Sequence, residues 1–209
     1  MMFKDRSDAG KKLAELLLEY SSEETVVFAL PRGGVAVAAE IAKAIDAPLD
    51  IIITKKIGHP SNPEYAVCAL AEDGGPICNQ SELERLGNQW LEDEKKKARD
   101  EILRRRKEYL GDTSRINVEN KIAIIVDDGI ATGLTMIASI EEMKRHNPKE
   151  IVVAIPVVPH LTALRLEGMV DRLVSIESTS NFLGALSAYY DDFTQVGDDE
   201  VKNILKEFY

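Results

Sequence analysis

The sequence contains few cysteines: Cys68 and Cys78 are the two among its 209 residues. Two cysteines do not build the disulfide framework of a small secreted protein, and we interpret both as reduced, buried thiols. No run of about 18 apolar residues is present, so no membrane-spanning helix is expected. The first twelve residues lack the apolar segment of a signal peptide. Together these absences predict a cytoplasmic protein without a membrane partner.

Positive charge is also scarce. The chain has 26 lysines and arginines against 36 aspartates and glutamates, a net charge of −10. Proteins that bind duplex nucleic acid usually carry a basic patch, so this composition argues against a nucleic-acid partner. The motifs GxxxxGK[ST], GxGxxG, HExxH and GxSxG are absent. No zinc site is predicted, because the three histidines are scattered along the chain: His59, His146 and His160.

Apolar strands alternate with helices along most of the chain. Short apolar runs predict buried strands at residues 25–30, 49–54, 122–127, 150–158 and 171–178. Helices are predicted at 7–20 (capped by Ser7 or Asp8), 35–45, 132–146, after His160 and near Asp198. Strands that are apolar throughout are typical of a parallel sheet covered on both faces. The predicted fold is α/β, with a mostly parallel twisted sheet, helices on both faces and one domain spanning 1–209.

Residues 58–118 interrupt this alternation. Residues 64–79 predict a hairpin about Asp73, and 81–110 predict charged helices with a break near Gly87. The apolar stripe of these helices consists of Leu83, Leu86, Trp90, Ala98, Ile102 and Tyr109. Opposite charges stand four residues apart, which favours helix, in the pairs Glu92/Lys96, Asp93/Lys97, Asp100/Arg104 and Glu101/Arg105. The charges indicate either a solvated helix face or cations that close over an anion.

The stretch KIAIIVDDGIATGLTM (121–136) ends a predicted strand with Asp127 and Asp128. In an open α/β sheet, ligands bind beyond the carboxyl ends of the strands. The backbone N–H groups of the following turn, with the hydroxyls of Thr132 and Thr135, can bind a phosphate at a helix N-terminus. Such a site beside two carboxylates suits a sugar phosphate whose hydroxyls donate to the carboxylates. The alternative is a capped turn without a ligand.

The segment IAIIVDDGIATGLT resembles the 5-phosphoribosyl-1-pyrophosphate (PRPP) motif of type I phosphoribosyltransferases. The resemblance implies the Rossmann-like fold of that family, with Asp127 and Asp128 on the ribose 2′- and 3′-hydroxyls. The rest of the implied PRPP loop consists of Gly129, Ile130, Ala131, Thr132, Gly133, Leu134 and Thr135. It also implies Mg²⁺, held by PRPP oxygens near the two aspartates and by no direct protein ligand.

A second turn, ALPRGG (29–34), resembles the family's pyrophosphate loop at Arg32, Gly33 and Gly34. Lys55 and Lys56 follow the next strand, where they could neutralise pyrophosphate or a carboxylated substrate, or simply be solvated. The predicted catalytic residues are therefore Asp127, Asp128, Arg32, Lys55 and Lys56.

Nearly the whole chain resembles a subgroup of predicted phosphoribosyltransferases without an assigned substrate. Residues 58–118 would then be an enlarged mobile loop or hood. The implied reaction of nucleotide metabolism transfers the phosphoribosyl group of PRPP to a nitrogen acceptor, with a nucleobase favoured, and releases pyrophosphate. The alternative is a PRPP-binding regulator or sensor without turnover, and a homodimer is expected from the resemblance alone.

The acceptor is less defined by the sequence. Ala131 stands where members acting on 6-oxopurines have an aspartate, which disfavours hypoxanthine and guanine. Phe182, Tyr189 or Tyr190 could stack on a base, or could pack within the protein.

Overall fold

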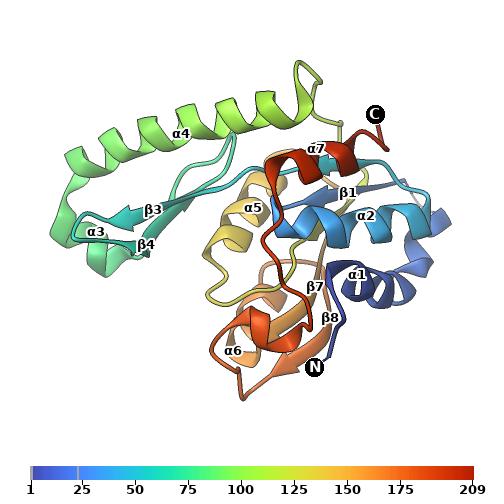
Figure 1. Cartoon of the computed structure of the whole chain (residues 1–209). Helices are drawn as coiled ribbons and strands as arrows, with labels where there is room; N and C mark the ends of the chain where they lie inside the picture. The colour runs from blue at the N-terminus through green and yellow to red at the C-terminus, as the bar shows by residue number, and fades with distance from the viewer. Residues whose placement is uncertain (1, 23) are drawn as a thin grey trace.

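The computed structural model describes residues 2–22 and 24–209 (Figure 1). Five parallel strands form one sheet in the order β2-β1-β6-β7-β8. These strands are β1 (Thr25–Ala29), β2 (Leu49–Ile51), β6 (Ile122–Val126), β7 (Glu150–Pro159) and β8 (Arg172–Thr179). The α/β class and the parallel sheet are therefore confirmed.

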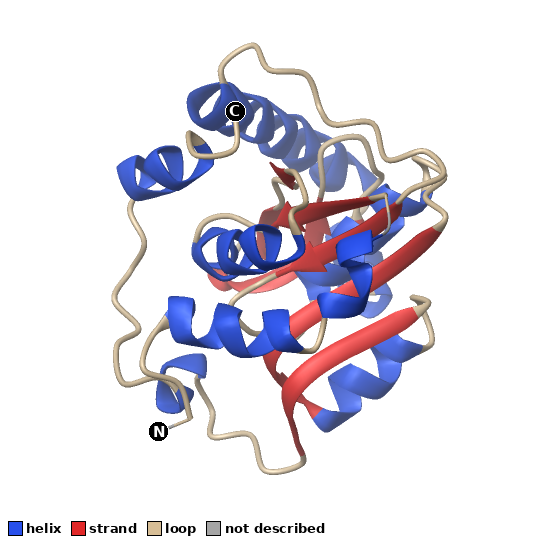
Figure 2. Cartoon of the chain, turned by 90° about the vertical axis from the view of Figure 1, so that its right-hand side faces the viewer, coloured by secondary structure: helices blue, strands red, loops and turns tan. Residues whose placement is uncertain are grey.

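Helices cover both faces of this sheet, as Figure 2 shows. They are α1 (Arg6–Glu15), α2 (Gly33–Ile45) and α7 (Asp198–Leu205) on one face, and α5 (Leu134–Lys144) and α6 (His160–Glu167) on the other. Successive side chains of a strand point to opposite faces. In β1, Val27 and Ala29 join the first cluster of helices, whereas Val26 and Phe28 join the second. This double burial explains why the strands are apolar throughout.

The insertion forms a second, antiparallel sheet and two helices. Its strands are β3 (Lys55–His59), β4 (Asn62–Leu70) and β5 (Ile77–Cys78), followed by α3 (Gln80–Leu86) and α4 (Asn88–Leu110). The predicted hairpin and the break at Gly87 are confirmed. In Figure 1 the hairpin and α3 extend to one side of the main sheet, and α4 runs above them toward α7. Short 3₁₀ helices occupy Leu18–Ser22 and Leu186–Tyr189.

The apolar stripe of α4 is buried at Ala98, Ile102 and Tyr109, as predicted. Its ion pairs match the prediction only in part. Glu101 and Arg105 pair at 2.9 Å, but Lys97 and Arg104 contact glutamates three residues earlier, at 2.6 and 2.8 Å. Spacings of three and four residues both bring side chains together on a helix, so sequence alone does not select one.

The cap of α1 was predicted wrongly. Asp5, rather than Ser7 or Asp8, caps the helix by accepting the N–H of Asp8 at 2.8 Å. Asp5 has the extended backbone that a capping residue needs, whereas Ser7 and Asp8 already lie within the helix.

None of the helices formed by residues 2–22 and 24–209 combines the length and apolar content needed to cross a bilayer.

Candidate functional site

Asp127 and Asp128 directly follow β6, at the carboxyl end of the parallel sheet. Both side chains are partly buried, and the N–H of Asp128 donates to Oδ1 of Asp127 at 2.8 Å. Burial and the adjacent charge of Asp128 raise the pKa of Asp127 well above its usual range, although Lys56 acts in the opposite direction. Two carboxylates so placed attract hydroxyl donors or cations.

The turn after the carboxylates leads straight into α5. Gly133, the residue before the helix, has a φ of 79°, a conformation that favours glycine. Ala131 and Thr132 are exposed, while Leu134 and Thr135 in the first turn are half-buried. Unpaired N–H groups at a helix N-terminus attract anions. The predicted phosphate-binding residues are thus brought together at one helix start.

The turn after β1 touches the carboxylate turn. A Cβ added to Gly33 would lie 1.9 Å from Oδ2 of Asp128, and one added to Gly34 would lie 2.8 Å from the carbonyl oxygen of Val126. Both positions therefore need glycine. The peptide bond between Pro31 and Arg32 is cis. The two motifs, about 95 residues apart in sequence, form one continuous surface because β1 and β6 are neighbouring strands.

Arg32 lies at the start of α2 and is one-third exposed. Its Nη1 lies 3.7 Å from Oδ1 of Asp198, at the start of α7. Lys55 and Lys56 begin β3 and line a cavity of about 370 Å³ beneath α4, together with Trp90. The charge of Lys56 reaches Asp127, but no described contact connects Lys55 with the two carboxylates.

Lys56 also lines a second cavity, of about 530 Å³, between the carboxylate turn and the insertion. The side chains around it include Thr132, Leu134, Tyr65, Asn79 and Arg165. The last three were not predicted from the sequence. Tyr65 and Asn79 belong to the insertion, whose position over the turn depends on its tertiary packing.

The aromatic residues of the tail pack mainly on one another. Tyr190 is 1% exposed and contacts Phe3 and Phe193, with ring centroids 5.2 and 4.8 Å apart. Tyr189 is buried and stacks on Phe182 at 5.7 Å. In this arrangement the two tyrosine rings pack within the protein, which was the stated alternative to stacking on a base. The Tyr190 hydroxyl donates to the carbonyl oxygen of Asp128 at 2.6 Å.

Arg6 is a site residue that the sequence analysis missed. Its Nε lies 2.7 Å from Oδ2 of Asp128, although 122 positions separate the two residues. No short-range pattern marks such a contact.

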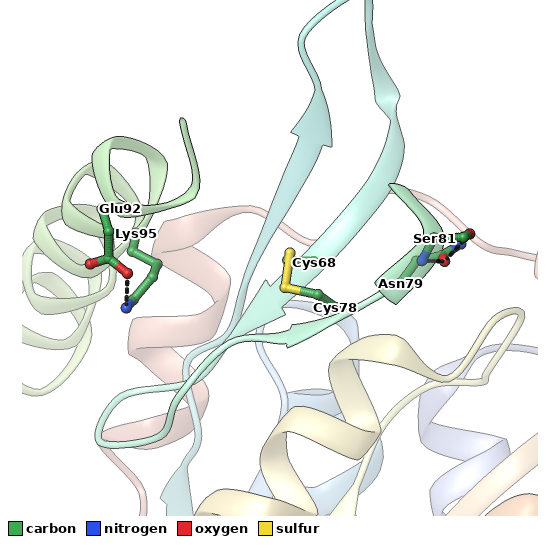
Figure 3. The surroundings of a disulfide bond; sticks show 6 residues. All are labelled: Cys68, Cys78, Asn79, Ser81, Glu92 and Lys95. Atoms are coloured by element: carbon green, nitrogen blue, oxygen red, sulfur yellow. Dashed lines mark hydrogen bonds and ion pairs between the residues drawn. A yellow bond between two sulfur atoms is a disulfide. The ribbon is translucent and has the colours of Figure 1, made fainter. Parts of the chain in front are cut away.

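The two cysteines form a disulfide, which corrects the prediction of reduced thiols (Figure 3). Cys68 of β4 lies directly opposite Cys78 of β5 in the antiparallel pair. The predicted hairpin placed both cysteines at the same distance from Asp73, and that symmetry was the available signal. Cys78 lines the 530 Å³ cavity.

A partly buried charged cluster lies beneath the insertion. Arg115 contacts Glu142 of α5 at 2.5 Å and Glu72 at 3.2 Å. Ligand atoms of Asp73, Glu142 and His146 lie within 4.8 Å of one another, an arrangement that could hold a metal ion. The guanidinium of Arg115 already pairs with both carboxylates of this group, and its Nη1 is 2.8 Å from Nε2 of His146. We interpret the cluster as structural.

Comparison with known proteins agrees with this geometry. The model of the phosphoribosyl transferase domain family matches residues 4–192. Two Mycobacterium tuberculosis proteins, from different strains, carry the name "Putative phosphoribosyl transferase" and are 38% identical over 202 residues, which is 96% of this chain and 45% of theirs. The chain thus spans less than half the length of these curated relatives.

A crystal structure from Thermus thermophilus has a TM-score of 0.84 and 36% identity, covering 100% of this chain and 99% of that one. The chain belongs to the phosphoribosyl transferase family.

Proposed function

We propose that this chain transfers the 5-phosphoribosyl group of PRPP to a nitrogen acceptor and releases pyrophosphate. The observation that carries the proposal is the contact between Gly33 and Asp128, which joins the two turns. The carboxylates lie between the N-termini of α2 and α5, and these helices pack on opposite faces of the sheet. PRPP likewise carries its pyrophosphate and its 5′-phosphate on opposite sides of one sugar.

Different residues of the site bind the ribose, the 5′-phosphate and the pyrophosphate of PRPP. Asp127 and Asp128 accept hydrogen bonds from the ribose hydroxyls and so hold the ring in place, which is a positioning role. The turn at the start of α5 binds the 5′-phosphate through backbone N–H groups. Arg32, the amides of Gly33 and Gly34, and Lys56 stabilise the leaving pyrophosphate.

The reaction replaces one bond at ribose C1 with another. The bond from C1 to the pyrophosphate oxygen breaks, and its electron pair leaves with pyrophosphate. A lone pair of the acceptor nitrogen forms the new bond, and the nitrogen then loses its proton to solvent water. Positive charge develops on the ring in the transition state, and the adjacent negative carboxylates stabilise this charge.

Mg²⁺ fits this site. The side chains nearest the proposed sugar position supply carboxylate oxygens, and Mg²⁺ favours oxygen ligands and phosphates. PRPP oxygens would hold the ion near Asp127 and Asp128, where it would neutralise charge on the leaving group.

A nucleobase is the acceptor that the site supports best. The 530 Å³ cavity beside Thr132 is of the size that small-molecule sites usually have. Tyr65, Ile77 and Leu134 supply apolar surface to it, and Asn79 supplies an amide that can pair with a base edge.

The test is a screen for pyrophosphate release from PRPP and Mg²⁺, with nucleobases, amines and amides as acceptors. We expect release with one nucleobase, and none from a variant carrying Asp127→Asn and Asp128→Asn. PRPP binding without release for any acceptor would instead support the regulator or sensor. Absence of PRPP binding would contradict both functions.

A further inference from the structure

Arg6 makes three contacts around Asp128. Its Nε donates to Oδ2 of Asp128 at 2.7 Å, and its Nη1 donates to the carbonyl oxygen of Thr194 at 2.8 Å. The guanidinium also lies over the ring of Phe193, 3.9 Å from its centroid. The side chains of Arg6 and Asp128 are only 11% and 13% exposed. A guanidinium held at three points keeps one orientation.

The N-terminal segment meets the segment that precedes α7 at this contact. Phe3 pairs with Tyr190 through a parallel bridge, and Figure 1 shows the N-terminal segment beside the red tail. The Tyr190 hydroxyl donates to the main-chain carbonyl oxygen of Asp128, while Arg6 donates to the Asp128 side chain. Asp128 is therefore fixed from two directions by segments outside both ligand-binding turns.

We propose that Arg6 is a positioning residue, which holds Oδ2 of Asp128 so that Oδ1 is presented to a ribose hydroxyl. This inference rests on the proposed function. A carboxylate accepts hydrogen bonds at both oxygens, so one oxygen can bind Arg6 and the other the sugar. An acceptor already oriented before binding avoids the entropy cost of ordering it with the ligand.

The two aspartates thus differ. Arg6 holds Asp128, whereas the described neighbour of the Asp127 carboxylate is the backbone N–H of Asp128. Loss of Arg6 would release the Asp128 side chain without touching the phosphate-binding turn at the start of α5. Affinity for the sugar should therefore fall while affinity for a simple phosphate persists.

The experiment compares wild type with Arg6→Gln by calorimetric titration with two probes, ribose 5-phosphate and ethyl phosphate. The dissociation constant of ethyl phosphate divided by that of ribose 5-phosphate measures what the sugar contributes to binding. We expect wild type to prefer ribose 5-phosphate, and Arg6→Gln to lose about tenfold of that preference, as for one hydrogen bond to a charged group. Arg6→Lys keeps the charge but cannot reach Asp128 and Thr194 together, and it should be intermediate.

Arg172→Gln is the matched control. Arg172 also pairs with a carboxylate, Glu19 at 2.6 Å, and lies near the ring of Tyr20, but it is remote from Asp128. Its ratio should equal that of wild type. If Arg6→Gln does not fold, Arg6→Lys decides the question with the same ratio.

An unchanged ratio in a folded Arg6 variant would overturn the inference and leave the proposed function intact. A higher ratio would also overturn it, because Arg6 would then compete with the sugar. A wild-type protein that binds ribose 5-phosphate no better than ethyl phosphate would overturn the inference together with the proposed role of the carboxylates.

Discussion

Tyr109 of α4 donates a hydrogen bond to Asp198 of α7, with 2.5 Å between its hydroxyl oxygen and Oδ1. Oδ1 of Asp198 also lies 3.7 Å from Nη1 of Arg32. Burial, followed by the bond to Asp198, raises the pKa of Tyr109 to about 12, so the hydroxyl remains a donor at neutral pH. One carboxylate thus connects the long helix of the insertion with the turn proposed to bind pyrophosphate.

Asp198→Asn should strengthen pyrophosphate binding. The substitution removes a negative charge beside Arg32, and a half-exposed pair of this kind contributes less than about 1 kcal/mol, so a gain of about two- to fivefold is expected. Titration with pyrophosphate and Mg²⁺ measures it. Asp199→Asn is the matched control, because Asp199 is 97% exposed and pairs with Lys202 instead. Equal effects of both variants would show that only net charge matters.

Asp127→Asn should stabilise the protein at pH 7. The raised pKa of Asp127 means that the folded state binds this proton more tightly than the unfolded state does, so ionisation of the carboxyl lowers the free energy of unfolding. The amide removes this cost, and we expect a gain of about 1 kcal/mol in urea unfolding. The difference from wild type should shrink as the pH falls through the raised pKa toward 3.8. A stability loss at pH 7 would contradict this interpretation.

Asp128→Asn should have the opposite effect on stability. It leaves the largely buried guanidinium of Arg6 without its anionic partner. Breaking a buried pair by removing one partner costs up to about 3 kcal/mol when the remaining charge keeps other contacts, as Arg6 does with Thr194. The same urea measurement at pH 7 serves both aspartates, and changes of equal sign would argue against their different environments.

Arg115→Met should destabilise the protein by about 3–5 kcal/mol, because it leaves the fully buried Glu142 without its cation. Burial raises the pKa of Glu142, and this effect would no longer be offset by Arg115. Adding Glu142→Gln should recover more than half of the loss. Arg104→Met is the control: Arg104 is exposed, and its solvent-screened ion pairs should contribute little to stability. A small loss for Arg115→Met would mean that water already solvates the cluster.

Reduction of the disulfide should lower the free energy of unfolding. Cys68 and Cys78 are ten positions apart, and closing a loop of that length contributes about 2–3 kcal/mol. Urea unfolding with and without a reductant measures the difference. The variant with Cys68→Ser and Cys78→Ser should not respond to reductant. Two free thiols in the unreduced, denatured protein would restore the sequence-based interpretation.

The sequence predicted the main sheet because its strands are buried on both faces. In β6, for example, Ile124 and Ile125 belong to different core clusters, so neither face tolerates a polar residue. The carboxylate turn was also predictable, because Asp127 to Thr135 form one local segment between a strand and a helix.

Long-range features were not predictable in the same way. Folding brings Arg6 to Asp128 from 122 positions away, and the first turn of α1 carries no motif that indicates this contact. Arg99 and Arg106 illustrate the same limit within α4. They resemble solvated helix charges, yet Arg99 donates to the carbonyl of Glu72 and Arg106 contacts the buried Asp50.

The central claim is that the two turns form a PRPP site. The most direct measurement is calorimetric titration of PRPP and Mg²⁺ into wild type and into the variant with Asp127→Asn and Asp128→Asn. We predict binding to wild type and a loss of at least about 100-fold in the folded variant, as expected from weakening two charge-assisted hydrogen bonds. Equal binding to both proteins, or no binding to wild type, would contradict the account.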